Sequence, residues 1–204
     1  MTSHAEAAPH GHGEHHGPPV PHYSSRVNPA TLGMFLFIAS EAALFGSFFA
    51  AYFFVRVVNP AAEPWPSFDL PVFVAGVNTA ILVTSSFTLH WAVQSIRRGN
   101  RAGMKAGLVL TIALGTAFLV TQIIEYAHLG VNTGFDAYAS VFFGLTGLHG
   151  AHVAVGLTAL MVVAVRAFRG HYSPEHHHGL EIPGIYWHFV DIMWIVVYTT
   201  IYLI

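Results

Sequence analysis

The sequence predicts an all-α integral membrane protein, built as a bundle of five transmembrane helices. The 204-residue chain is 54% hydrophobic and only 9% charged, whereas soluble domains carry about 25% charged residues. Its apolar residues form five long runs, each close to or above the roughly 20 residues that a helix needs to cross the hydrocarbon core of a bilayer. A β-barrel is excluded, because its strands would be alternating segments of about 10 residues.

The five predicted spans follow one another with short connections, which leaves almost no room for a soluble domain. They form one transmembrane domain, residues 28–204. The first connection is rich in proline and places Trp65 where an interfacial aromatic residue belongs. The second connection, around residues 97–101, is a short turn. The spans are expected at residues 30–57, 71–96, 104–128, 137–166 and 184–204.

Small residues recur inside the spans. Gly103 and Gly107 are four residues apart in the third span, and Gly144, Gly147 and Gly150 lie in the fourth. Small side chains let helix backbones approach closely, which matters where lipid provides no hydrophobic drive between helices. We therefore expect these glycines at helix contacts.

The basic residues predict the orientation of the bundle. With a cytoplasmic N-terminus, seven of the eight lysines and arginines lie inside and only Arg56 lies outside. A cytoplasmic N-terminus and an external C-terminus follow. No organelle-type presequence is recognisable, which favours a bacterial plasma membrane.

The first 27 residues form a separate segment rich in histidine, proline and glycine. The segment lacks the apolar core of a secretory signal peptide, and its composition is typical of a disordered polar tail. Weak binding of a divalent metal is the alternative, because neutral imidazoles are metal ligands. Six of the fifteen histidines lie here: His4, His10, His12, His15, His16 and His22.

Composition also excludes several classes of function. The chain has no cysteine, so disulfides, iron–sulfur clusters and thiolate zinc sites are ruled out together. Its formal net charge is -2 and the basic residues form no patch beyond one loop, which argues against a nucleic-acid partner.

Few polar side chains are expected at membrane depth, and they are the candidate functional residues. A carboxyl there costs roughly 2.5–3.5 kcal/mol on insertion scales, so it needs a partner or a purpose. Glu41 and Asp191 are the most informative, since Glu125 lies near a helix end. The full set is Glu41, Asn78, His90, Gln122, Glu125, His149, His152, His188 and Asp191.

The intramembrane histidines admit two interpretations. His149 and His152 are three residues apart, so they share a helical face and could meet a carboxylate, an ion or a haem. Alternatively, their imidazoles hydrogen-bond across helices as packing contacts, which we favour because two histidines on one helix do not make a haem cavity. The run His176–His178 lacks the spacing of a metal site.

Motifs in six segments resemble, in order, those of subunit III of haem–copper oxidases. Across residues 30–204 they are Ser40-Glu41 with the aromatic residues that follow, Asn78–Leu82 with Ser85–Trp91, Gln122 with Glu125-Tyr126, Gly147–Val153, His176-His177 with Gly179–Glu181, and Tyr186–Trp194, which includes Trp187. The chain resembles the five-helix form of that family, and the histidine-rich tail has no counterpart in the resemblance.

The resemblance implies a cytochrome c oxidase subunit without its own catalytic site or redox centre. Haem and copper are then expected in the partner subunits I and II, and other respiratory-chain subunits are further candidate partners. The family fold implies two groups of helices separated by a V-shaped cleft that holds phospholipids. Glu41 matches the family carboxylate that reacts with carbodiimides, and Arg166 resembles the arginine that binds a lipid phosphate.

By this resemblance Glu41, His149, His152 and Arg166 are lipid-cleft or proton-related residues. A protonated Glu41 could donate to His149 or His152 without burying a net charge. Subunit packing or a polar network is the expected role of Asn78, His90, Gln122, Glu125, Trp187, His188 and Asp191.

Several functional alternatives remain open. The electron donor of the oxidase could be cytochrome c, which we favour, or a quinol. A nitric-oxide-reductase accessory protein, a stand-alone proton channel and an isolated membrane haemoprotein are more distant readings. The last two predict proton flux or a haem absorption band from the chain alone.

Overall fold

The computed structural model describes residues 29–58, 70–129, 137–174 and 178–204, and its helices are the five that the sequence predicts. All five are long and apolar enough to cross a membrane. The histidine-rich tail, Trp65, His176 and His177 lie outside the described residues. The helices are α1 (Pro29–Val58), α2 (Val72–Arg97), α3 (Arg101–Leu129), α4 (Ala137–Phe168) and α5 (His178–Tyr198), which continues into a π-helical segment, η2 (Thr199–Leu203).

The last helix begins earlier than its apolar run suggests. The predicted fifth span starts at residue 184, whereas α5 starts at His178 and carries Pro183 inside it. Pro183 is the sixth residue of α5, beyond the first four backbone N–H groups that have no intrahelical partner, so its missing N–H costs the bond to the carbonyl of Gly179. Pro183 therefore removes a single backbone bond close to this end, and the helix extends past it. The third helix also starts three residues earlier than predicted.

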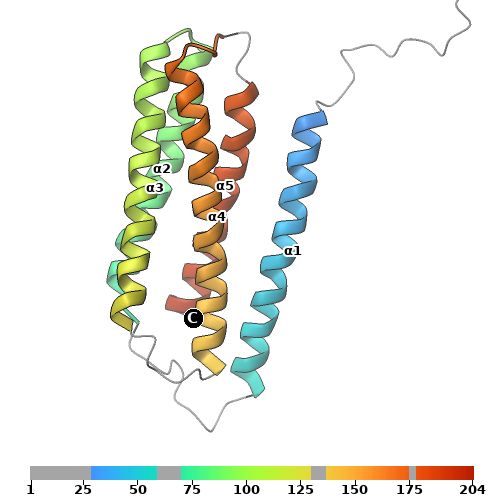
Figure 1. Ribbon diagram of the computed structural model, residues 1–204. Helices are drawn as coiled ribbons and strands as arrows, with labels where there is room; N and C mark the ends of the chain where they lie inside the picture. The colour runs from blue at the N-terminus through green and yellow to red at the C-terminus, as the bar shows by residue number, and fades with distance from the viewer. Residues whose placement is uncertain (1–28, 59–69, 130–136, 175–177) are drawn as a thin grey trace, which may run out of the picture.

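Helices α2 to α5 form a packed bundle, and α1 lies at one side of it (Figure 1). Helix α1 packs chiefly on α4 and α5. Its apolar window is only 6% buried, compared with 33–44% for the other four helices. In Figure 1 the C-terminal end of α1 lies beside α4, and α1 diverges from the bundle toward its own N-terminal end. A division of the helices by a lipid-filled cleft stays a prediction.

The C-terminal end of α1 is hydrogen-bonded to the last residues of the chain. The hydroxyl of Tyr52 donates to the carbonyl of Thr200 at 3.2 Å, and the guanidinium of Arg56 donates to the carbonyl of Ile204 at 2.7 Å. These two bonds hold α1 at the end where the ribbons converge.

Close approach of α2 and α3 depends on two of the predicted glycines. A Cβ at Gly107 would lie 2.7 Å from the Cβ of Ala92, and a Cβ at Gly103 would lie 2.7 Å from the hydroxyl of Ser95. Between these helices Gly99 adopts a positive φ of 78°, which glycine takes without steric cost. Asn100 then caps α3, since its Oδ1 accepts the Gly103 N–H at 2.9 Å.

Candidate functional site: polar pairs between the helices

Glu41 of α1 pairs with His152 of α4 inside the membrane span. Glu41 Oε2 lies 2.8 Å from His152 Nε2, and the two side chains are 18% and 11% exposed. Of the two histidines that the sequence offered as partners, His152 is therefore the one that meets the carboxyl. The pair lies on the side of the bundle where α1 is loosely packed.

Hydrogen-bond chemistry fixes the charge of this pair. His152 Nδ1 lies 2.7 Å from the carbonyl oxygen of Leu148, which can only accept, so Nδ1 carries a hydrogen. One further proton then lies between Nε2 and the Glu41 carboxyl. Whether it resides on oxygen or on nitrogen, the pair has no net charge. This neutrality lowers the cost of placing a carboxyl at membrane depth.

Aromatic rings enclose the pair. The Phe45 ring lies 5.0 Å from the His152 ring, and the Tyr186 ring is stacked with the His152 ring at a centroid distance of 6.5 Å. Phe37 in turn packs against Tyr186 at 5.9 Å. These rings keep the local surroundings apolar, while the Glu41 carboxyl stays partly exposed.

His149 faces the interior of the bundle instead. It is fully buried, and its Nε2 lies 3.2 Å from the carbonyl of Val190. Its ring packs at 4.7 Å on Trp194 and edge-on to Phe118 at 5.7 Å. Asn78 reaches the same level from α2 and donates to the carbonyl of Phe118 at 3.3 Å. His149 thus contacts α5 and α3 inside the bundle, and its predicted lipid-cleft or proton-related role stays a prediction.

Ser86 of α2 joins two predicted residues of α5. Its hydroxyl lies 2.9 Å from His188 Nδ1 and is hydrogen-bonded to Asp191 Oδ2. Asp191 is 4% exposed. The structure therefore places His188 and Asp191 in one polar group. Ser86 itself was not singled out from the sequence, because a serine in an apolar run carries no distinctive signal.

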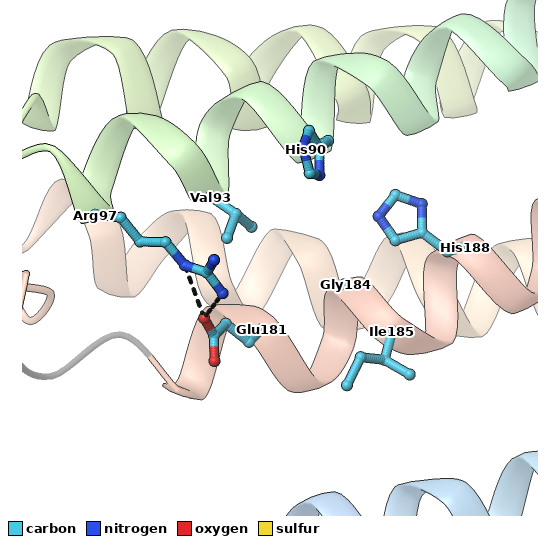
Figure 2. A pocket seen from close by; sticks show the side chains of 7 residues that line it. All are labelled: His90, Val93, Arg97, Glu181, Gly184, Ile185 and His188. Carbon is cyan, nitrogen blue, oxygen red and sulfur yellow. Dashed lines mark hydrogen bonds and ion pairs between the residues drawn. The ribbon is translucent and has the colours of Figure 1, made fainter.

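A groove of about 210 Å³ opens between α2 and α5 next to this group. Figure 2 shows His90 and Arg97 of α2 opposite His188 and Glu181 of α5. Arg97 pairs with Glu181 at 2.5 Å at the end of the groove, and these side chains are 57% and 21% exposed. His90 pairs with its own helix, through Gln94 at 2.7 Å. The groove thus carries polar groups on an outer face of the helix pair.

The two remaining predicted residues of α3 lie near its C-terminal end. Glu125 accepts a hydrogen bond from the Tyr202 hydroxyl at 3.1 Å, and Gln122 is buried one turn earlier. Next to Glu125, Tyr126 donates to Thr146 of α4 at 2.6 Å. Tyr202 was missed in the sequence because it follows the motif that drew attention to the last helix.

Trp187 is the packing centre of the last helix. The indole is fully buried, and its Nε1 donates to Ser85 of α2 at 2.9 Å. Its ring edges lie against two glycines, Gly115 of α3 and Gly156 of α4. One side chain thus contacts three helices of the bundle, and a role of Trp187 in packing between subunits stays a prediction.

Arg166 lies at the far end of α4, exposed and positioned over the Tyr172 ring, with its guanidinium carbon 5.8 Å from the ring centroid. Helix α4 ends at Phe168, and Gly170, two residues further on, has a positive φ of 81° that allows the chain to reverse. Burial raises the pKa of the Tyr172 hydroxyl, and the charge of Arg166 opposes that rise. The cation–π contact holds the guanidinium beside the Tyr172 ring, past the end of α4.

No group of three or more histidine, aspartate or glutamate side chains converges as a metal-ligand set within residues 29–58, 70–129, 137–174 and 178–204. The predicted absence of a cofactor in this chain stays a prediction. What the geometry does show is a series of polar pairs, each joining two helices.

A five-helix bundle whose intramembrane carboxyls are paired between helices defines a multi-pass membrane protein. Comparison with known proteins specifies the family. Residues 19–204 match the family model for cytochrome c oxidase subunit III. The chain belongs to this family.

Curated relatives agree over most of the chain. Cytochrome c oxidase subunit 3 of Synechocystis is 40% identical over 173 residues, which cover 84% of this chain and 74% of the relative. The corresponding protein of Thermostichus vulcanus is 36% identical over 188 residues, covering 91% and 92%. That of Drosophila melanogaster is 41% identical over 177 residues, covering 83% and 67%. The resemblance stated from the motifs is therefore confirmed.

Proposed function

We propose that this chain is an accessory, lipid-binding subunit of an aerobic terminal oxidase, which reduces O2 to water and translocates protons. In this role it stabilises subunit I and supports proton uptake there, while haem and copper reside in subunits I and II. The chain has no catalytic step of its own. Family membership supports the oxidase, and the geometry of α1 and α4 supports the lipid role.

The Glu41–His152 pair is the observation that carries the lipid role. It is a neutral, partly exposed polar contact between the loosely packed α1 and the bundle. A site with an apolar aromatic lining and one neutral hydrogen-bonding pair suits an uncharged part of a lipid better than an ion.

Arg166 completes the proposed lipid site. It follows His152 by 14 residues, which is close to four helical turns, so the two side chains project from nearby faces of α4. At 1.5 Å per residue they are about 21 Å apart along the axis, compared with about 15 Å for one leaflet of the hydrocarbon core. A phosphate at Arg166 would therefore place acyl chains on the face that leads to Glu41.

The groove between α2 and α5 supports packing against another protein subunit. His90 is exposed on a membrane-spanning helix, and His188 lines the groove beside it. Polar side chains on an outer helix face are costly in lipid but acceptable against protein. We assign this face to the contact with another oxidase subunit.

The electron donor and the orientation complete the proposal. The relatives carry the name cytochrome c oxidase, which favours cytochrome c over a quinol as donor. Copper ligands in the subunit II encoded with this chain would support that choice, and their absence would favour the quinol. The charge distribution supports a cytoplasmic N-terminus in a bacterial plasma membrane.

Replacing Glu41 in the assembled oxidase tests the proposal. Glu41→Gln keeps a donor for His152, so proton stoichiometry and bound lipid should match those of the unmodified enzyme. Glu41→Leu removes the polar contact and should lower bound lipid and turnover rate, with protons per electron unchanged. Complete loss of pumping in Glu41→Gln, with assembly intact, would contradict an accessory role.

A flux measurement separates the proposal from the proton-channel alternative. The purified chain in liposomes should show no proton conductance above that of protein-free vesicles. Conductance that disappears in Glu41→Gln would instead support a channel.

A further inference from the structure

An open apolar groove lies between α3 and α4. It is on a different face of α4 from His152, which pairs with Glu41, and from Arg166. Its volume is about 470 Å³. Met161, Val165 and Phe168, which line it, follow His152 by 9, 13 and 16 residues, which places them roughly on the opposite side of the helix. The full lining is Ile112, Met161, Ala164, Val165, Phe168 and Arg169.

Two basic side chains stand at one end of this groove. Arg169 belongs to its lining, and the ammonium of Lys105 lies 5.3 Å from the centroid of the Phe168 ring. Phe168 is 57% exposed, so the cation and the ring meet at the edge of the groove. Both cations are at the end of the bundle that the charge distribution assigns to the cytoplasm.

The groove runs inward from these cations. Ile112 lies seven residues after Lys105, and Met161 lies eight residues before Arg169, so both walls extend about two helical turns, or about 11 Å. Along that depth the lining is aliphatic or aromatic. The site therefore has positive charge at the interface and an apolar channel below it.

We propose that this groove binds one anionic phospholipid, with its phosphate at Lys105 and Arg169 and an acyl chain along Ile112 and Met161. Basic pockets between transmembrane helices at the cytoplasmic side suit anionic headgroups. A guanidinium can bind two phosphate oxygens at once, and the ammonium adds a second charge. A soluble phosphate would use the cations and leave the apolar channel unexplained.

Lipid retention by the assembled complex provides the test. The complex is reconstituted in nanodiscs of phosphatidylcholine with a minor fraction of phosphatidylglycerol, and retained lipid is counted by native mass spectrometry. Lys105→Gln with Arg169→Gln should lower the preference for phosphatidylglycerol about 30-fold, the loss expected for two neutralised basic side chains. The matched control, Arg98→Gln with Arg101→Gln, removes the same charge at the same end outside the groove lining.

Each outcome decides the question. Selective loss in the groove variant, with retention in the control, supports the site. Equal retention in both variants, equal loss in both, or displacement of the lipid by millimolar glycerol phosphate alone would overturn it. Glu41→Leu should leave this lipid bound, because Glu41 contacts α4 through His152, which lies on another face of that helix. Failure of the accessory-subunit proposal and failure of this site are therefore distinguishable.

Discussion

Replacing Gly115 by alanine should destabilise the bundle through a single side chain, Trp187. A Cβ at Gly115 would lie 2.6 Å from the indole Cη2 and 2.8 Å from Cζ2, whereas carbon atoms in contact are about 3.5–4.0 Å apart. The indole cannot retreat freely, because Gly156 confines its other edge and its Nε1 is bonded to Ser85. The new methyl group therefore forces a shift of about 1 Å between packed helices.

The expected size of this effect follows from two opposing contributions. Overpacking of a closely packed core costs about 1–3 kcal/mol, while alanine is favoured over glycine in a helix by about 0.5–1 kcal/mol. Gly150→Ala isolates the second contribution, since a Cβ at Gly150 meets nothing within 4 Å. Gly115→Ala should therefore be less stable than Gly150→Ala by about 1–3 kcal/mol.

The free energy of unfolding is measurable by circular dichroism in mixed micelles with increasing sodium dodecyl sulfate. A second comparison uses Trp187→Phe, which removes the fused ring that Gly115 contacts. In that background Gly115→Ala should cost less, with a coupling of about 1 kcal/mol or more. Equal stability of the two alanine variants, or a cost unchanged by Trp187→Phe, would refute the steric explanation.

Three further outcomes test the polar contacts. Ser85→Ala leaves the Trp187 N–H buried without its acceptor, and the same micelle assay should show a loss of about 1–3 kcal/mol; a loss near zero would mean that another acceptor replaces it. Glu181→Gln breaks a largely exposed ion pair with Arg97, so it should change stability by no more than about 1 kcal/mol and less at high salt; a larger loss would contradict the surface character of that pair. Dicyclohexylcarbodiimide should modify Glu41 ahead of the other intramembrane carboxyls, as peptide mass spectrometry would show, because Glu41 is partly exposed whereas Glu125 and Asp191 are buried; preferential modification of a more buried carboxyl would contradict this geometry.

The number of helices was predictable because each apolar run is long and continuous, and those properties need no tertiary information. The start of α5 was not predictable, because a proline usually marks a helix boundary in sequence, whereas α5 runs through Pro183 at the cost of one backbone hydrogen bond near its start. The sequence also does not show which glycines lie at helix contacts. Gly107 packs against Ala92, whereas Gly150 meets nothing, although both sit in similar small-residue patterns.

The choice between His149 and His152 shows why the site was only partly predictable. The two residues are three apart, which places them about 60° apart around the helix. That angle is enough for His152 to meet Glu41 on α1 while His149 turns toward Val190 of α5. Helical periodicity identified the candidates, but the partner of each depends on where α1 and α5 lie around α4.

The three intramembrane carboxyls share one structural logic. Glu41 joins α1 to α4 through His152, Asp191 joins α5 to α2 through Ser86, and Glu125 joins α3 to η2 through Tyr202. Apolar helix faces pack with many neighbours almost equally well in lipid, so they specify pairing weakly.

A carboxyl that needs a hydrogen-bonding partner penalises every arrangement in which that partner is absent. The pairs therefore select this order of helices from its competitors, and they do so at different places along the bundle. On this reasoning each of the three carboxyls helps to specify how the helices assemble, whatever further role Glu41 has in lipid binding. An exchange such as Glu41→Gln, which keeps the hydrogen bond to His152, should accordingly preserve the fold, whereas Glu41→Leu should loosen α1 and leave α2 to α5 packed.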